Sequence, residues 1–243
     1  MKLRAEHITK SFDGKTVLND VSIHLNEGEL VCLLGTSGGG KTTLFHIISG
    51  LLIPDSGNIY LDQEEITGQS GHVSYMLQKD MMLPYKKVID NVSLPLVIQG
   101  MKPREARERA AGYFAEFGLD GYENKYPCQM SGGMRQRAAL LRTYLFSRDV
   151  ALLDEPFSAL DSITKSSLHT WYLEMMNKLQ LSTLFITHDI DEAILLSDRI
   201  YILSGEQGRI AAELTIDRDR EARKTFALTE EFLEYKRRII GLL

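Results

Sequence analysis

The sequence predicts an α/β fold with a mostly parallel sheet. Short apolar runs rich in β-branched residues recur along the chain, and each is followed by a segment with helical patterning. These runs are ELVCLL, HVSYML, VALLD, TLFITHD and RIYILSG. A glycine-rich loop, GTSGGGKTT, separates the first run from its helical segment.

Three further segments complete the expected organisation. Residues 1–30 alternate apolar and polar positions between the turns DGK and NEGE, which predicts β-strands. Residues of about 90–147 lack strand patterns, and a helix is expected from Pro103 to near Gly118. The charged stretch 217–243 is expected to be helical. No linker or repeat divides the chain, so 1–243 is expected to form a single domain with a helical subdomain inserted at about 90–147.

The composition excludes several classes of protein. The 243 residues include 28 basic and 33 acidic side chains, and a formal net charge of −5 does not predict a nucleic-acid or lipid surface. Two isolated cysteines indicate a reducing cytosol. The most apolar stretch, LFHIISGLLI, is shorter than the ~20 residues of a membrane-spanning helix, and the amino terminus has no signal-peptide pattern. We expect the chain itself to be soluble.

The glycine-rich loop matches the phosphate-binding pattern G-x-x-x-x-G-K-[ST] through Gly35, Gly40, Lys41 and Thr42. Glycines allow backbone N–H groups to approach phosphate oxygens, the lysine reaches the terminal phosphates, and the threonine hydroxyl binds Mg²⁺. A strand–helix turn without a ligand is the alternative. The strand before the loop and the helix after it favour phosphate binding.

A second nucleotide-site feature is VALLDE at 150–155. Four apolar residues predict a buried strand that ends in Asp154 and Glu155. Asp154 can support a Mg²⁺ ion, and Glu155 can accept a proton from water. An ordinary strand end with an acidic cap is the alternative, which the preceding phosphate loop disfavours.

The segment MSGGMRQR at 130–137 brings these features into one family pattern. Its order with the other motifs resembles the ATP-binding-cassette (ABC) ATPases along nearly the whole chain. The matching positions are Phe12, the phosphate loop (Gly35, Thr36, Ser37, Gly38, Gly39, Gly40, Lys41, Thr42, Thr43), Gln78, Ser131, Gly132, Gly133, Asp154, Glu155, Ser158 to Asp161, and His188. Met130, Met134 and Thr36 depart from the commonest pattern, where leucine, glutamine and proline stand.

The resemblance implies a P-loop NTPase (RecA-like) core with an antiparallel β subdomain and an inserted helical subdomain, and it implies ATP and Mg²⁺ as cofactors. Phe12 would stack on adenine, and Asp161 would belong to the nucleotide site. The implied catalytic residues are Glu155, His188, Gln78 and Lys41. The implied metal-binding residues are Thr42, Gln78 and Asp154.

The resemblance also implies partners. A second ABC ATPase subunit, taken as another copy of this chain, would supply Ser131, Gly132 and Gly133 to the ATP bound by the first. Membrane-spanning permease subunits and a solute-binding protein would complete a transporter, with this chain peripheral on the cytoplasmic face of the cell membrane. No nucleic-acid partner is expected.

Two functional classes compete within this resemblance. One is the ATPase subunit of a nutrient importer of the nitrate, sulfonate, taurine and vitamin-precursor group. The other is a soluble cassette ATPase of DNA repair or translation. Repair members carry a long coiled coil between the segments that correspond to Gln78 and Ser131, and translation members carry two cassettes in one chain. In this chain only 52 residues separate Gln78 and Ser131. This chain has neither pattern, and a P-loop kinase or GTPase would not need MSGGM or ITHD. The absence of fused spanning segments favours an importer.

A final expectation concerns the permease. Family members receive a short helix of the spanning subunit beside the segment that follows Gln78. We expect Met81, Met82, Leu83 and Tyr85 to line a groove for that helix, because methionines adapt to irregular surfaces. Packing of these residues inside the junction is the alternative.

Overall fold

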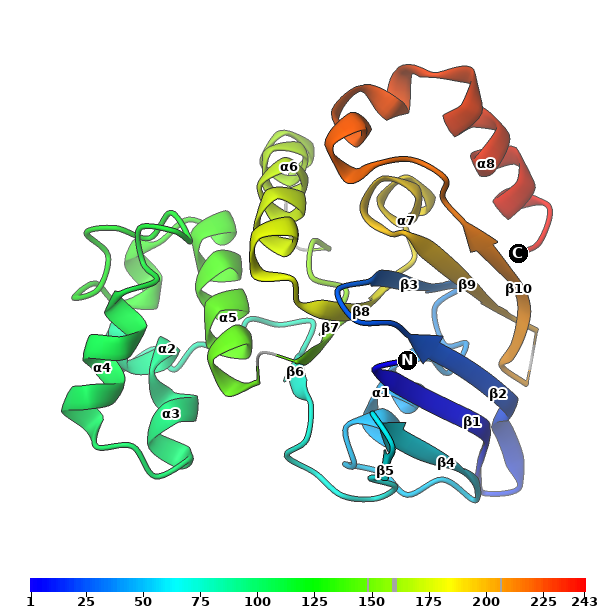
Figure 1. Cartoon of the computed structure of the whole chain (residues 1–243), viewed down its shortest axis with the longest axis horizontal. Helices are drawn as coiled ribbons and strands as arrows, with labels where there is room; N and C mark the ends of the chain where they lie inside the picture. Colours follow the sequence, from blue (N-terminus) through cyan, green and yellow to red (C-terminus); the bar gives the residue numbers. More distant parts are fainter. Residues whose placement is uncertain (148, 159–160, 206) are drawn as a thin grey trace.

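A computed structural model of the protein contains a six-stranded, mostly parallel sheet, as the sequence predicts (Figure 1). Its strand order is β10-β9-β3-β8-β7-β6. The strands are β3 (Leu30–Gly35), β6 (Ser74–Met76), β7 (Val150–Asp154), β8 (Ser182–Thr187), β9 (Arg199–Ser204) and β10 (Arg209–Thr215). The structure describes residues 1–147, 149–158, 161–205 and 207–243, and the side chains at 162–164, 221 and 224 are also outside this description.

One prediction from strand spacing is wrong. A strand rather than a helix follows β9, and β10 pairs antiparallel with it, Arg209 opposite Ser204. Gly205 and Gly208 between the two strands both adopt positive φ. Positive φ is common in hairpin turns and favours glycine. The two glycines therefore indicate a hairpin, which the apolar run alone does not indicate.

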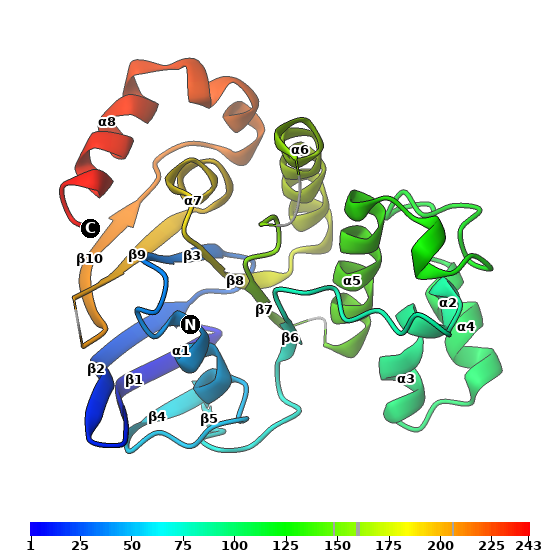
Figure 2. The same ribbon diagram turned by 180° about the vertical axis from the view of Figure 1, so that it is seen from behind.

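A second, antiparallel sheet holds the amino-terminal strands in the order β2-β1-β4-β5. Its strands are β1 (Leu3–Phe12), β2 (Lys15–Leu25), β4 (Ser56–Leu61) and β5 (Glu64–Glu65). Side chains of this sheet and of helix α1 (Lys41–Ile48) share one buried apolar cluster with β3, β7 and β8. The antiparallel sheet and α1 therefore cover one face of the large sheet (Figure 2).

Helices cover the opposite face, and one group of them projects from β6 and β7 (Figure 1). This group comprises α2 (Val88–Val92), α3 (Leu94–Ile98), α4 (Pro103–Ala111), the 3₁₀ turn η1 (Pro127–Gln129) and α5 (Gly132–Phe146). The helix predicted from Pro103 begins there but ends at Ala111, earlier than expected. Gly112 follows, and the N–H groups of Tyr113 and Phe114 bond to carbonyls three residues back, which tightens the chain into turns.

The remaining helices lie over the large sheet or along its far edge. They are α6 (Ser162–Leu179), α7 (Ile190–Leu196), η2 (Arg220–Leu228) and α8 (Glu230–Ile240). The last two confirm that the charged stretch from 217 is helical. None of the helices in the described part of the chain has the length and apolar character that a membrane span requires.

Candidate functional site

The phosphate loop lies between the end of β3 and the start of α1, as predicted. Gly38 and Gly40 have φ of 81° and 92°, a region that residues with a Cβ rarely adopt. A Cβ at Gly40 would also lie 2.8 Å from the side chain of Leu18 and 2.9 Å from the carbonyl of Val17. Glycine at position 40 is therefore required by the backbone and by its neighbours on β2.

Lys41 opens α1 with a buried side chain, and its Nζ donates to the carbonyls of Gly35 and Thr36 at 2.8 Å each. Burial lowers the pKa of this ammonium, against the opposing effect of Glu155 and Asp154. The loop borders a cavity of about 510 Å³. Its lining residues are Val17, Ser37, Gly38, Gly40, Lys41, Thr42, Thr43, Gln78, Glu155, Ile186 and His188.

Asp154 ends β7 as a buried carboxylate next to the phosphate loop. Its Oδ2 accepts hydrogen bonds from the Thr42 hydroxyl at 3.1 Å and from the Tyr75 hydroxyl at 3.3 Å. Burial raises the pKa of Asp154, and the bond from Thr42 partly offsets this effect. A carboxylate and a hydroxyl oxygen side by side are the hard oxygen donors that fit Mg²⁺.

Glu155, Gln78 and His188 come together although they are far apart in the sequence. One carboxylate oxygen of Glu155 accepts from Gln78 Nε2 at 2.9 Å, and the other lies 2.9 Å from His188 Nδ1. The three residues follow β6, β7 and β8, which are adjacent and parallel, so their carboxyl ends meet at one edge. This arrangement places a carboxylate, an amide and an imidazole among the groups that line the phosphate-loop cavity.

The backbone of Glu155 is strained. Its φ is 45°, which is uncommon for a residue with a long side chain and costs of order 1–3 kcal/mol. Its N–H donates to the carbonyl of Ile186 on β8 at 3.1 Å, which holds the turn in place. The chain therefore turns at Glu155, and its carboxylate contacts Gln78 and His188.

Ser131, Gly132 and Gly133 start α5 on the other side of Glu155. The Ser131 hydroxyl caps this helix by accepting from the Met134 N–H at 3.3 Å. Gly132 lines a second cavity of about 630 Å³, which also touches Gln78, Glu155 and His188. None of the three residues lines the phosphate-loop cavity.

The remaining predicted residues lie at the periphery. Phe12 ends β1 with a 44 % exposed ring, and Lys10 Nζ lies 5.6 Å from its centroid. Phe12 is not among the residues lining the phosphate-loop cavity, whereas Val17, which sequence reasoning missed, is. Of the segment Ser158 to Asp161, residues 159–160 lie outside the described part of the chain. Ser158 donates its hydroxyl to the Glu155 carbonyl at 3.1 Å.

Two arginines of α5 hold the segment after Gln78, and sequence reasoning missed both. Arg135 pairs with Asp80 at 3.1 Å and also donates to the carbonyl of Met130 at 3.0 Å. Arg142, two turns later, donates to the carbonyls of Asp80 and Met81. Arg135 stands inside MSGGMRQR, but only the folded chain reveals its partner.

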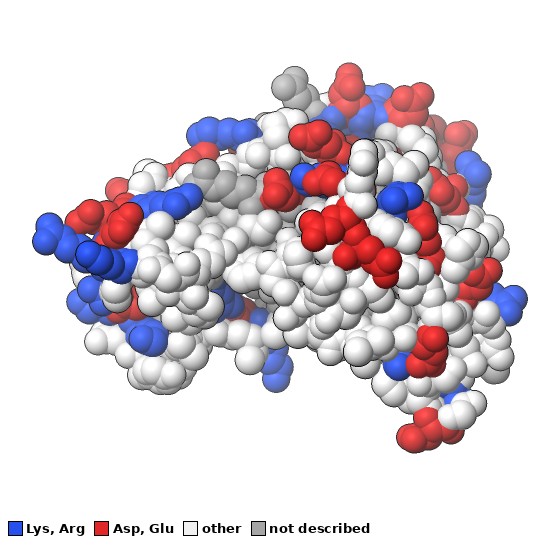
Figure 3. Space-filling model, turned by 60° about the horizontal axis from the view of Figure 1, so that its bottom comes forward, with Lys and Arg blue, Asp and Glu red and all other residues white. Residues whose placement is uncertain are grey.

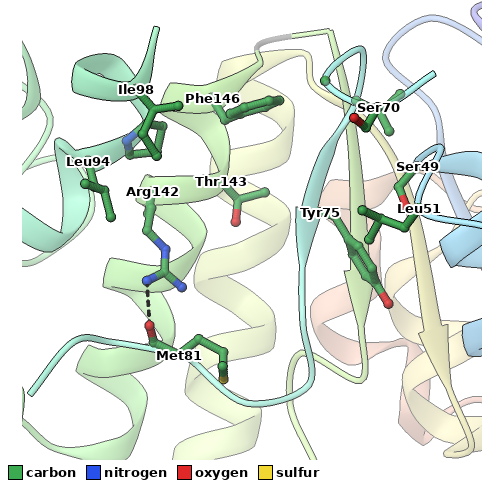
Figure 4. A pocket seen from close by; sticks show the side chains of 13 residues that line it. Ser49, Leu51, Ser70, Tyr75, Met81, Leu94, Ile98, Arg142, Thr143 and Phe146 are labelled. Atoms are coloured by element: carbon green, nitrogen blue, oxygen red, sulfur yellow. Dashed lines mark hydrogen bonds between the residues drawn. The ribbon is translucent and has the colours of Figure 1, made fainter.

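A third cavity, of about 370 Å³, opens between the helices of 88–146 and the sheet (Figure 4). Its residues are Ser49, Leu51, Ser70, Gly71, Val73, Tyr75, Met81, Leu94, Pro95, Ile98, Arg142, Thr143 and Phe146. Met81 is 56 % exposed at one end of it, and the exposed apolar side chains of Leu51 and Ile98 flank it. Figure 3 shows mostly uncharged side chains across the middle of the lower face of the molecule.

Of the four residues expected to line the groove, Met81 lines this cavity and Met82 does not. Met82 is only 8 % exposed and packs in the main apolar core, which is the alternative that the sequence left open. Leu83 and Tyr85 are not among the residues that line this cavity. The chain turns at Met81, whose φ is 48°, so neighbouring methionines face opposite environments.

A phosphate loop, a buried aspartate beside its threonine and a strained glutamate facing a histidine define a nucleotide-hydrolysing P-loop ATPase. The chain belongs to the ABC transporter family, whose sequence profile matches residues 18–158. The chain is therefore a nucleotide-binding ATPase of that family, as the sequence predicts.

Individual relatives and solved structures agree with this assignment. The chain is 42 % identical over 244 residues to the formylaminopyrimidine import ATP-binding protein ThiZ of Halalkalibacterium halodurans, covering 99 % of this chain and 96 % of the relative. It is 36 % identical over 253 residues to the nitrate import ATP-binding protein NrtD of Synechocystis sp., covering 100 % and 95 %. A dimeric ATP-binding cassette bound to ADP and Pi in a post-hydrolysis state is 26 % identical with a TM-score of 0.75, covering 89 % of this chain and 100 % of that one.

Proposed function

We propose that this chain is the ATP-hydrolysing subunit that powers import of a small solute through separate membrane-spanning subunits. The hydrolytic part of this proposal rests on one observation. Glu155 contacts both Gln78 and His188 in the cavity that the phosphate loop borders. Similarity to import ATP-binding proteins along nearly the full length of each relative supports the transport part. We treat residues 1–243 as one nucleotide-binding domain in which about 90–147 form an inserted helical subdomain.

Each predicted residue has a role in this proposal. Backbone N–H groups of the loop 35–43 and the Lys41 ammonium bind the phosphates of ATP, where charge-assisted hydrogen bonds stabilise the transferred group. Glu155 accepts a proton from the attacking water, His188 holds that water against the terminal phosphate, and Gln78 orients it. In this proposal the exposed ring of Phe12 stacks on the adenine, and Val17, which borders the phosphate-loop cavity, adds an apolar contact.

The oxygen atoms of Thr42, Asp154 and Gln78 would hold Mg²⁺ in this site. Thr42 and Asp154 already lie 3.1 Å apart, and Gln78 adds a neutral amide. When bound, the ion neutralises charge on the phosphate oxygens. Tyr75 would fix the Asp154 carboxylate through its hydroxyl.

A second copy of the chain would complete each ATP site. Ser131, Gly132 and Gly133 lie at the helix N-terminus of α5, where N–H groups and the helix dipole favour an anion. They line no part of their own chain's phosphate-loop cavity, so in this proposal they meet the terminal phosphate bound by the partner. Asp161 would lie at the same interface. ATP then joins the two copies, and hydrolysis releases them.

The cavity at Met81 is the proposed docking site for a helix of the spanning subunit. Most of its lining is apolar. Arg142 donates a hydrogen bond to the Met81 carbonyl at 3.0 Å, which connects the cavity to the segment that carries Gln78 (Figure 4). A helix seated there would therefore contact the segment that carries Gln78. Binding to such subunits would place the chain on the cytoplasmic face of the membrane, and a solute-binding protein would deliver the cargo.

Met81→Asp tests the transport function directly. We expect wild-type protein to bind vesicles that carry its spanning subunits and to drive ATP-dependent solute uptake, measured with labelled nitrate, a sulfonate and a formylaminopyrimidine. Met81→Asp should abolish vesicle binding and uptake while the melting temperature and basal ATPase stay near wild type, because surface substitutions cost little stability.

The neighbouring residues provide matched controls for this test. Met82→Asp should lower the melting temperature and the basal ATPase together, because it buries a charge in the core. Tyr85→Asp changes a residue that is 73 % exposed outside the cavity and should bind vesicles normally. A folded Met81→Asp variant that still binds these vesicles would refute the docking site, and wild-type ATPase without uptake of any solute would argue for the soluble alternative.

A further inference from the structure

A group of charged side chains joins α6 to the loop that carries His188. Lys165, in the first turn of α6, places its Nζ 2.7 Å from Asp189 Oδ2 and 2.5 Å from Glu192 Oε1. Its own backbone N–H donates to the carbonyl of Asp161 at 2.9 Å. His169, one turn further along α6, places Nε2 3.5 Å from the same oxygen of Glu192. These side chains connect three elements, α6, α7 and the loop between β8 and α7.

Glu192 is the buried centre of this group. Its side chain is 4 % exposed, and its second oxygen accepts a hydrogen bond from the Thr187 hydroxyl. Burial raises the pKa of Glu192, but contacts with His169, Lys165 and Thr187 outweigh this effect and leave the pKa below its ordinary value. Glu192 is therefore a buried carboxylate that needs the cation of Lys165.

This group of side chains holds the residues on both sides of His188, whereas the side chain of His188 itself is exposed. Thr187 is held by Glu192, and the Thr187 hydroxyl in turn accepts from the Asp189 N–H at 3.0 Å. Asp189 is held by Lys165 and also caps α7. The imidazole of His188 is 54 % exposed, so burial does not determine where it points. Its orientation depends on the backbone on either side and on the contact of Nδ1 with Glu155.

The same face of α6 also contacts the loop that carries Glu155. His169 packs edge-on against Phe157, with ring centroids 4.7 Å apart, and Phe157 lies two residues after Glu155. Lys165 and His169 are four residues apart, which puts them on one face of the helix. One helix face therefore supports the loops of both members of the Glu155–His188 pair.

We propose that Lys165 and Glu192 are positioning residues for ATP hydrolysis, which hold the loop 187–189 so that His188 stays directed at Glu155. They touch neither the phosphates nor the attacking water, and their effect passes through the backbone of Thr187 and Asp189. This inference rests on the hydrolytic roles proposed for Glu155 and His188. A small displacement of such a pair is sufficient to slow a reaction strongly.

Four variants separate positioning from stability. Lys165→Met removes both ion pairs and leaves Glu192 buried without its cation, so the variant is also expected to melt earlier. Lys165→Met combined with Glu192→Gln removes both charges and should recover the melting temperature. Lys165→Arg keeps a cation. Lys178→Met is the matched control. Lys178 lies on the same helix as Lys165, and the substitution breaks the ion pair of its exposed ammonium with Glu116.

We expect Lys165→Met and the double variant to lower kcat about 10- to 100-fold, with KM and the ADP dissociation constant within about twofold of wild type. Lys165→Arg should restore most of kcat, and Lys178→Met should leave kcat unchanged. A double variant that regains both its melting temperature and its kcat would overturn the inference, because the pair would then act only through stability. A wild-type kcat in Lys165→Met would overturn it equally.

The NMR signals of the His188 imidazole report its position without turnover. In nucleotide-free wild-type protein we expect one shift set by Glu155, and in the double variant a shift displaced toward that of the unfolded chain. An unchanged His188 shift in the double variant would overturn the inference. Absence of ATP hydrolysis in the wild type would instead refute the proposed function, so the two failures are distinguishable.

Discussion

Glu155→Gln is expected to lower ATP turnover by roughly 10²- to 10⁴-fold, the contribution typical of general acid–base catalysis. Glutamine has nearly the same shape, so it can still contact Gln78 and His188, but its amide cannot accept the proton of the attacking water. ATP affinity should stay within a few-fold of wild type, because Glu155 is not part of the phosphate loop. Phosphate release and equilibrium ATP binding, measured on the same preparation, check both parts.

Glu64→Gln is the matched control for this substitution. Glu64 is an exposed carboxylate on β5 outside the described cavities at the site. It should leave turnover unchanged. Turnover of Glu155→Gln within a few-fold of the wild-type rate would refute the role of Glu155 as the base.

Lys41→Ala is expected to act on binding itself. The ammonium is buried against the loop, and hydrogen bonds from a charged group contribute about 1.5–3 kcal/mol each, so ATP affinity should fall about 10- to 100-fold. The carbonyls of Gly35 and Thr36 also lose a donor, so a moderate drop in melting temperature should accompany the loss. Calorimetric titration with ATP, with melting followed on the same sample, measures both effects.

Lys41→Ala and Glu155→Gln should therefore fail differently. The first should lose affinity, and the second should lose turnover with affinity kept. Equal ATP affinity in Lys41→Ala and wild-type protein would contradict the phosphate-binding role of the loop.

The grouping of Gln78, Glu155 and His188 in one site could be predicted from the family resemblance. Gln78, Glu155 and His188 each follow a short apolar run, and parallel strands place such ends side by side. The phosphate loop likewise combines a local pattern with a local strand and helix. The phosphate loop depends on residues that are neighbours in the sequence, so the sequence alone carries it.

Features that depend on distant contacts could not be predicted. Met81 and Met82 have the same side chain, and only the turn at Met81 decides that one is exposed and the other buried. The pairs of Asp80 with Arg135 and of Lys165 with Glu192 join segments whose spatial relation the sequence does not state. Gly205 and Gly208 mark the turn between β9 and β10, a signal that the periodicity of the apolar run does not include.

Two copies of the chain are proposed to build each ATP site together. Light scattering after size-exclusion chromatography tests it most directly, on Glu155→Gln with and without Ser131→Arg. Glu155→Gln should double its mass from 27.5 kDa when ATP and Mg²⁺ are present and return to the single-chain mass when they are removed. Adding Ser131→Arg should abolish this doubling while ATP still binds the single chain, because in the proposed dimer Ser131 faces the partner's phosphate. A double variant that still doubles its mass with ATP would contradict the account.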